Sequence, residues 1–384
     1  MMKTMTVFGT RPEAIKMAPL VNKLKKNNIN NIVVVTAQHR EMLDQVLDIF
    51  DIIPDYDLDI MKKNQTIFDI TSNVLNGMKS ILEKEMPDIV FVHGDTTTTM
   101  ATSLACFYLK IKIAHVEAGL RTYNKYSPFP EEKNRQITGV LADLHLSPTN
   151  ESRNNLIKEN IEPETIFVTG NTVIDALFES LNIIKQKKLE KDFDEKIKKL
   201  TCSDVFSKKL ILVTGHRREN FGYNFKNIFL SFKKLCLKYK NDLNFIYPVH
   251  LNPNVRDMAL DMLCDIDNFF LIEPLDYLFF TYVMNKSHII ITDSGGIQEE
   301  APALGKPVLV TRDTTERPEA VEAGTVILVG SDSLAIETNF CEVFENADLY
   351  EKMSTAINPY GVGNSCDKIV EVVKSWESKK RVKG

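Results

Sequence analysis

The sequence lacks the short signatures of several common enzyme classes. It contains no G-x-G-x-x-G after a predicted strand, no G-x-x-x-x-G-K-[ST], no G-x-S-x-G and no H-E-x-x-H. These motifs carry dinucleotide binding, P-loop chemistry, serine hydrolysis and zincin activity. Two D-x-D pairs, Asp57–Asp59 and Asp265–Asp267, are too short a pattern to indicate a metal site. We therefore expect neither a cofactor nor a catalytic metal.

Paired cysteines, long apolar runs and an excess of one charge are also missing. The six cysteines are dispersed without a C-x-x-C pair, which argues against a zinc or redox site. No uncharged apolar run reaches 18 residues, and no basic leader opens the chain, so we expect a cytoplasmic protein. The 47 basic and 52 acidic residues are spread along the chain, which gives no surface for nucleic acid or an anionic membrane.

What is present is an alternation of short β-rich runs with segments of helical period. This rhythm predicts βαβ units and parallel sheets, and 384 residues are enough for two domains. The fold class is therefore α/β, with two Rossmann-like, doubly wound domains facing across a cleft. We expect an N-terminal domain over 1–180, a lysine-rich helix and linker over 181–209, a C-terminal domain over 210–363, and a last helix over 364–384 that crosses back to the first domain.

The predicted strands and helices can be given by residue number. Strands are expected at 5–8, 32–36, 89–93, 113–117, 144–147 and 166–169, and then at 210–214, 244–249, 269–272, 289–292, 307–311 and 326–329. In the first half, helices are expected at 12–26, 42–49, 67–84 and 97–109. Ligands of open α/β sheets bind beyond the carboxyl ends of the strands, so the residues that follow these runs are the candidates for function.

Two of these strand ends are suited to an anion. After the first strand, Arg11 and Lys16 flank a helix start at Pro12, where the helix dipole and a bidentate guanidinium both favour negative charge. After the strand at 289–292, two glycines let backbone N–H groups approach a phosphate, and Ser294 can cap the helix. Glu300 lies one turn into that helix, where a carboxylate can hold ribose hydroxyls.

Three further carboxylates are hard to explain as structure. Asp95 follows a predicted strand, Glu117 ends another, and Glu131 lies in a Pro-Phe-Pro-Glu-Glu segment. Carboxylates that crowd one edge of a sheet raise each other's proton affinity, which separates acid from base. Each of the three could also be a simple cap, but together they favour catalysis.

The motifs together resemble the non-hydrolysing UDP-N-acetylglucosamine 2-epimerase family. The resemblance runs from about residue 3 to 375 and rests on seven segments: Gly9-Thr-Arg-Pro-Glu-Ala-Ile-Lys16, His93-Gly-Asp-Thr96, His115-Val-Glu-Ala-Gly-Leu-Arg-Thr122, Pro130-Glu-Glu132 with Asn134-Arg135, Thr214-Gly-His-Arg-Arg-Glu-Asn220, Asp293-Ser-Gly-Gly-Ile-Gln-Glu-Glu300 and Thr315-Glu-Arg-Pro-Glu319.

The resemblance implies a fold, a reaction and an assembly. The fold is a pair of Rossmann-like domains of the GT-B type, with the active site in the cleft and the chain in a homodimer. The reaction is the reversible conversion of UDP-N-acetylglucosamine to UDP-N-acetylmannosamine, without nicotinamide, for surface polysaccharide precursors. UDP and the C2 proton leave by anti elimination to give 2-acetamidoglucal, and UDP then adds back while a proton reaches the other face.

The resemblance also implies roles for single residues. Asp95, Glu117 and Glu131 would be the acid and base groups, and His216 would lie near the diphosphate or the leaving oxygen. Positive charge beside the phosphates would come from Arg11, Lys16 and Arg135. The diphosphate would be held by Ser294, Gly295 and Gly296, the ribose by Glu300, and the nucleotide by Arg317. Uracil would lie against the segment from Leu275 to Phe280. Several relatives carry a glutamine where Leu275 stands, so in this chain backbone groups would make the contacts to uracil in place of that side chain. Gln38 and His39 would belong to an allosteric substrate site.

Other readings remain open at this point. Within the family, a hydrolysing epimerase would release free N-acetylmannosamine and UDP, and another member acts on UDP-2,3-diacetamido-glucuronic acid. A GT-B glycosyltransferase would share the fold but need an acceptor. A binding protein without catalysis would not need the three carboxylates.

Overall fold

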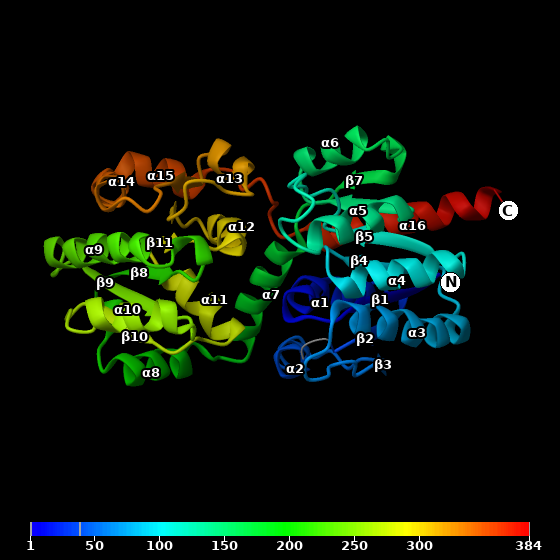
Figure 1. Ribbon diagram of the computed structural model, residues 1–384, viewed down its shortest axis with the longest axis horizontal. Helices are drawn as coiled ribbons and strands as arrows, with labels where there is room; N and C mark the ends of the chain where they lie inside the picture. The colour runs from blue at the N-terminus through cyan, green and yellow to red at the C-terminus, as the bar shows by residue number, and fades with distance from the viewer. Residues whose placement is uncertain (1, 38–39, 384) are drawn as a thin grey trace. The chain divides into compact units, whose positions relative to one another are not determined.

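The computed structural model describes residues 2–37 and 40–383, and its elements are labelled in Figure 1. The chain divides into two compact units: unit 1 contains Met1–Glu179 and Tyr360–Gly384, and unit 2 contains Ser180–Pro359. The chain therefore passes between the units twice, once within helix α7 (Thr172–Gln186) and once just before Tyr360. In the described part of the chain, no helix is long and apolar enough to cross a membrane.

Unit 1 is built on a parallel sheet whose described strands run in the order β3-β2-β1-β4-β5-β6-β7. The order starts in the middle and grows outward in both directions, which is the doubly wound arrangement expected from the sequence. The strands are β1 (Lys3–Phe8), β2 (Asn30–Val35), β3 (Tyr56–Asp57), β4 (Ile89–His93), β5 (Lys112–Val116), β6 (Leu144–Ser147) and β7 (Ile166–Val168). All but β3 were predicted; β3 has only two residues and gives no periodic signal.

Helices cover both faces of this sheet (Figure 1). On one face α3 packs against α4 and α4 against α5, and elsewhere α1 contacts both α2 and the C-terminal α16. The helices are α1 (Arg11–Lys26), α2 (Arg40–Ile49), α3 (Ile67–Glu85), α4 (Thr97–Tyr108), α5 (Glu131–Leu141), α6 (Asn150–Lys158) and α16 (Ser365–Lys383). Ile369, Val370 and Val373 are buried, so α16 completes the hydrophobic core of unit 1.

Unit 2 repeats the design with a second parallel sheet, in the order β10-β9-β8-β11-β12-β13 among its described residues. All six strands were predicted from the sequence. They are β8 (Lys209–Thr214), β9 (Leu243–Pro248), β10 (Phe269–Ile272), β11 (Ile289–Thr292), β12 (Val308–Val310) and β13 (Val326–Leu328). The two parallel sheets flanked by helices confirm the α/β fold class.

The helices of unit 2 enclose a core rich in aromatic rings. Phe225, Phe229 and Phe232 of α9 pack against Tyr247 and Phe269 of the sheet. The helices are α8 (Glu190–Thr201), α9 (Tyr223–Lys238), α10 (Pro253–Leu263), α11 (Tyr277–Lys286), α12 (Gly295–Ala303), α13 (Pro318–Glu322), α14 (Ser333–Glu345) and α15 (Ala347–Thr355). The charged helix α8 lies in the segment that the sequence marked as helix and linker, and it packs against α11 through Phe193 and Phe279.

Candidate functional site

The carboxyl ends of β4 and β5 bring two of the predicted carboxylates together in unit 1. Asp95 lies in the turn between β4 and α4, and Glu117 follows β5 directly. Because β4 and β5 are neighbours in register, His93 stands beside Val116 and the two loops begin at the same edge. The expectation that strand ends gather the polar groups therefore holds for this pair.

Glu117 has an unusual backbone and a crowded carboxylate. Its φ of +61° lies in the left-handed region, which non-glycine residues adopt mainly where the surrounding structure imposes it, often at functional sites. One carboxylate oxygen, Oε2, accepts a bond from Lys16 Nζ and lies 3.7 Å from His93 Nε2. The other oxygen, Oε1, is 3.3 Å from Arg135 Nη2. Side chains from three elements, α1, β4 and α5, thus converge on a side chain that is only 7% exposed.

Arg135 joins the two carboxylates. It lies on α5 with 5% of its surface exposed, and its Nη2 atom is 2.5 Å from Asp95 Oδ2 as well as 3.3 Å from Glu117 Oε1. Its Nη1 atom donates to the backbone carbonyl of Glu117. Asn134, one residue earlier, donates to the carbonyl of Asp95 at 3.0 Å. The start of α5 therefore fixes both loops, and Asp95 remains the more accessible acid, with 31% of its side chain exposed.

These contacts set the protonation of the cluster. Burial by itself would raise the pKa of Glu117, but the nearby charges, that of Lys16 foremost, hold that pKa well below its usual value. Burial lowers the pKa of His93 to about 4, and the two cations add to this effect. At neutral pH the cluster therefore contains an ionised Glu117 beside a neutral His93.

A second buried carboxylate, Glu13, connects the loop of Arg11 to the loop of Asp95. Glu13 is 2% exposed, and its Oε2 atom accepts the N–H groups of Gly9 at 3.0 Å and Thr10 at 2.8 Å. Its Oε1 atom accepts the Thr96 hydroxyl at 2.6 Å. Thr10 in turn caps α1, which completes a capping box. Arg11, the first residue of α1, is partly exposed beside this joint.

Glu131 stands apart from this cluster. Glu131 is the first residue of α5 and half-buried, and within residues 2–37 and 40–383 no hydrogen bond or ion pair links its side chain to Asp95 or Glu117. Its neighbour Glu132 is buried and accepts the N–H groups of Thr122 and Tyr123. Gln38 and His39 lie outside the described residues.

In unit 2 the residues predicted to hold an anion lie at the start of α12. Gly295 and Gly296 open the helix, so their N–H groups are among those without a partner inside it. Ser294 stands at the cap position, but its side chain makes no capping bond; its N–H donates to the Thr292 hydroxyl at 2.9 Å. A Cβ on Gly295 would lie 3.7 Å from Arg217 Nη2 and 3.9 Å from Arg317 Cζ, so two guanidinium groups flank the helix start.

The second arginine is held by the helix itself. Arg317 Nε pairs with Glu299 of α12, a carboxylate that is 1% exposed. The hydroxyl of Thr315 donates to Gln298 Oε1 at 2.6 Å and accepts the N–H of Arg317 at 3.0 Å. The segment from 315 to 317 is thus anchored on two successive residues of α12, Gln298 and Glu299.

His216 follows β8 and is oriented by Asp293. The fully buried Asp293 carboxylate accepts the N–H groups of His216 at 2.9 Å and Arg217 at 2.8 Å, and its other oxygen is 3.5 Å from His216 Nδ1. The imidazole stacks on His250, with ring centroids 5.6 Å apart. Burial lowers the pKa of His216, although Asp293 opposes that shift. A neutral imidazole at pH 7 can both donate and accept a hydrogen bond.

The other nucleotide candidates lie in the loop and helix segments that follow the carboxyl ends of unit 2 strands. Glu300 is half-buried on α12, and its Oε1 atom lies 3.6 Å from where a Cβ on Gly296 would be. Leu275 precedes α11, and Phe280 is on its first turns; both are half-buried. Asp276 caps α11 by accepting the Phe279 N–H at 2.8 Å, which fixes the turn between them.

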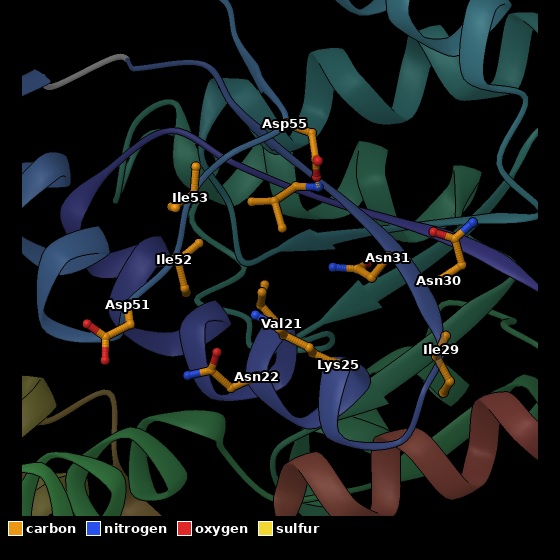
Figure 2. Close-up of a pocket in the computed structure, with 11 residues that line it drawn as sticks. Val21, Asn22, Lys25, Ile29, Asn30, Asn31, Asp51, Ile52, Ile53 and Asp55 are labelled. Carbon is orange, nitrogen blue, oxygen red and sulfur yellow. Dashed lines mark hydrogen bonds between the residues drawn. The ribbon is translucent and has the colours of Figure 1, made fainter.

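Figure 2 shows a pocket of about 330 Å³ in unit 1 that is separate from these loops. It is lined by Asn22 and Lys25 of α1, by Asn30 and Asn31 at the amino end of β2, and by Asp55, among others. The candidate residues follow the carboxyl ends of the strands, so this pocket belongs to the other edge of the sheet. Among the described residues, no group of three or more His, Cys, Asp or Glu side chains could hold a metal ion.

Sequence reasoning missed several residues of these sites. His93 and Glu13 were visible in their motifs but received no role, and Arg217 follows the predicted His216. Asn171 is a further omission: its Nδ2 atom donates to Glu117 Oε2 at 3.2 Å across 54 residues of sequence. The available signal was the polar pair Asn171-Thr172, which follows β7 after Thr169 and Gly170.

Comparison with known proteins agrees with this geometry. The family model described as UDP-N-acetylglucosamine 2-epimerase matches residues 22–374. The chain is 55% identical to the UDP-N-acetylglucosamine 2-epimerase of Neisseria meningitidis, over 97% of this chain and 99% of that protein. It is 56% identical to the Campylobacter jejuni enzyme of the same name, over 97% of each.

A solved structure gives the same result for the fold. The crystal structure of UDP-GlcNAc 2-epimerase from Neisseria meningitidis bound to UDP-GlcNAc matches with a TM-score of 0.87 and 55% identity, over 97% of this chain and all of that chain. Its two-domain GT-B-like architecture confirms the fold predicted from the sequence. On the strength of the family model, the relatives and the shared fold, the chain belongs to the UDP-N-acetylglucosamine 2-epimerase family.

Proposed function

We propose that this protein interconverts UDP-N-acetylglucosamine and UDP-N-acetylmannosamine without hydrolysing them. The proposal is carried by the cluster of Asp95, Glu117 and Arg135 at the edge of the unit 1 sheet, in a chain of this family. Unit 2 holds the UDP part through α12, and unit 1 supplies the groups that act on the sugar. Nucleotide-sugar epimerisation for surface polysaccharide is the corresponding cellular role.

The reaction we propose has two halves. In the first, a base removes the C2 proton, the C1–oxygen bond breaks with its electron pair leaving on UDP, and 2-acetamidoglucal forms. In the second, the UDP oxygen adds back to C1 while an acid delivers a proton to the other face of C2. Fixed positive charge near the departing diphosphate lowers the barrier of both halves. Arg11, together with Arg217, Arg317 and the N-terminus of α12, would supply that charge.

The environments of the carboxylates support different roles. Glu117 is ionised and surrounded by Lys16, Arg135 and other donors, so it is a weak proton acceptor in this arrangement. We propose that Glu117 anchors the two cations. Asp95, which is more exposed and has one ion pair, and Glu131, which is half-buried at the start of α5, would then carry the proton transfers. His216 would contact the diphosphate or the leaving oxygen.

Incubation with UDP-N-acetylglucosamine alone in D2O tests the function. We expect UDP-N-acetylmannosamine carrying deuterium at C2, observed by proton NMR. Free N-acetylmannosamine plus UDP would instead identify a hydrolysing epimerase. No change without an acceptor would point to a glycosyltransferase, and turnover of only UDP-2,3-diacetamido-glucuronic acid would identify the other epimerase of the family.

We further propose that the protein works in the cytoplasm as a homodimer. Phe107 and Tyr108 at the end of α4 are more than half exposed, beside a hollow of about 300 Å³ lined by Leu75, Lys79 and Leu109. An apolar patch of this kind on α3 and α4 supports contact with a second copy. Light scattering should give twice the chain mass of 43.7 kDa, and Tyr108→Lys should shift it toward the monomer. A monomeric wild type would contradict the assembly.

A further inference from the structure

Asn171 contacts Glu117 in an orientation that the structure fixes. It follows β7 and precedes α7, and it is 2% exposed. Its Oδ1 atom accepts the N–H of Val173 at 3.1 Å. Because that acceptor faces the helix, the amide nitrogen must face the other way, where Nδ2 donates to Glu117 Oε2 at 3.2 Å. The amide therefore presents a donor to the carboxylate.

The backbone of Asn171 is held by the segment that returns from unit 2. Its N–H donates to the Tyr360 carbonyl at 2.8 Å. The preceding residue, Gly170, has a φ of +90°, and a Cβ there would lie 2.6 Å from Ser365 Oγ and 3.1 Å from the Tyr360 oxygen. Only glycine allows this close approach. The position of the amide beside Glu117 is thus set by both chain segments that connect the units.

We propose that Asn171 is a positioning residue, whose amide keeps the Glu117 carboxylate oriented between Lys16 and Arg135 during the proposed epimerisation. This inference rests on the proposed function. Lys16 lies on Oε2 and Arg135 on Oε1, so rotation of the carboxylate would break both ion pairs. A neutral donor on Oε2 opposes that rotation and adds no charge. A Glu117 carboxylate free to rotate would disturb Asp95 as well, because Arg135 also holds the Asp95 side chain.

The charges around Glu117 explain why an amide is suited to this position. The charged groups that face Glu117 are Lys16 from α1 and Arg135 from α5. Asp95 shares Arg135 Nη2 with Glu117, and the neutral His93 faces it from β4. Two cations therefore balance two carboxylates. An aspartate at 171 would add a third carboxylate of nearly the same shape, and a like charge this close raises the proton affinity of Glu117.

The experiment compares two isosteric substitutions. Asn171→Asp replaces an amide that donates to Glu117. Asn22→Asp replaces an amide that donates to Glu179 Oε1 at 2.8 Å, in the same unit but in the wall of the pocket of Figure 2. We expect the acid limb of the kcat/KM profile to move up by about one pH unit or more in Asn171→Asp. The profile of Asn22→Asp should match the wild type.

A second substitution keeps the test decisive if Asn171→Asp does not fold. Asn171→Ala removes the donor without adding charge, and we expect kcat to fall about tenfold or more while the affinity for UDP, measured by calorimetry, stays within about twofold. Wild-type activity in D2O is checked first: an inactive wild type overturns the proposed function. An active wild type with unchanged pH profile and kcat in the Asn171 variants overturns the positioning role alone.

Discussion

Asp95 and Glu117 carry the same chemical group in different surroundings. Glu117 is buried with a cation on each oxygen, whereas Asp95 has one ion pair and a partly exposed side chain. Proton transfer needs a carboxylate that can change partners, while charge anchoring needs one that cannot. Substitutions of single residues can therefore test the proposed division of roles.

Asp95→Asn should lower the rate of deuterium incorporation by about 10²- to 10⁴-fold, because a positioned proton-transfer group typically contributes that much. UDP affinity should persist, since the proposed diphosphate contacts are in unit 2. Asp143→Asn is the matched control: Asp143 pairs with Lys112 at 2.7 Å at the amino end of β5, away from the cluster. Undiminished exchange in Asp95→Asn would remove Asp95 from the mechanism.

His93 gives unit 1 a pH dependence of known sign. Burial lowers its pKa from 6.5 to about 4, so between these values the unfolded chain binds more protons than the folded one. Its contribution is fully present above pH 6.5 and is lost as the pH falls toward 4, by about 3 kcal/mol in total. In urea unfolding, His93→Asn should therefore be destabilising at pH 7 and much less so at pH 4. An equal difference at both pH values would contradict the buried neutral imidazole.

Two capping boxes, at the starts of α1 and α3, serve different purposes. Thr66 and Asp69 cap α3 on an exposed surface, whereas Thr10 and Glu13 cap α1 inside the protein and also hold Thr96. The same local motif therefore only stabilises the start of the helix in α3. In α1 it also links the loop of Arg11 to the loop of Asp95.

We expect Asp69→Ala to cost a little unfolding free energy, because an exposed capping box is lost, with turnover unchanged. Glu13→Ala should cost more and also lower kcat, because the loops of Arg11 and Asp95 lose their common anchor. Glu13→Gln should recover most of the activity, since its oxygen still accepts two backbone N–H groups and its amide still reaches the Thr96 hydroxyl. Urea midpoints measure the effect on stability, and initial rates measure the effect on turnover. Equal kinetics for Glu13→Ala and Asp69→Ala would contradict the link between the two loops.

The close approach of Gly170 to the returning segment also gives a prediction. Gly170→Ala combines a strained left-handed φ with a contact of 2.6 Å to Ser365 Oγ, whereas Gly222→Ala has a similar φ of +76° and nothing within 4 Å. Both should lower the urea midpoint, and Gly170→Ala should lower it further, by about 1 kcal/mol or more beyond the cost at Gly222. Equal midpoints would show that the segment from 360 to 365 can move aside.

UDP binding should stabilise one of the two units first. UDP at a concentration of about 100 times its Kd stabilises the folded state that binds it by about 2.7 kcal/mol. We expect hydrogen-exchange protection at the start of α12 and in the 312–317 segment of unit 2. Uridine, which lacks the diphosphate, should protect these amides much less. Protection by UDP confined to unit 1 would contradict the assignment of the nucleotide to α12.

Most of the fold could be predicted from the sequence, because buried parallel strands are short apolar runs bounded by glycine and polar residues. The runs at 89–93 and 289–292 are examples, and the strands observed there have the predicted bounds. The two-residue β3 could not be predicted, since its pairing with β2 depends on tertiary contact alone. Strand order also follows only from the assembled sheet.

The site was predictable only in part. Motifs at strand ends pointed to Asp95, Glu117 and the start of α12, because the carboxyl ends of parallel strands all lie at the same edge of their sheet. Partners across long sequence separation gave no such signal: Glu299 with Arg317, and Asn171 with Glu117, meet through side-chain geometry that periodicity does not carry. The residues named from motifs thus need the structure to show what holds them.

The split of unit 1 across the sequence has a consequence for biosynthesis. Helix α16 belongs to the unit that contains the N-terminal sheet, yet the ribosome makes it after all of unit 2. Unit 2 can therefore finish folding from a nascent chain while the earlier unit still waits with an uncovered apolar face along α1. Completion of the first unit, and with it the Tyr360 contact behind Asn171, is postponed until the segment from Tyr360 to α16 has been translated.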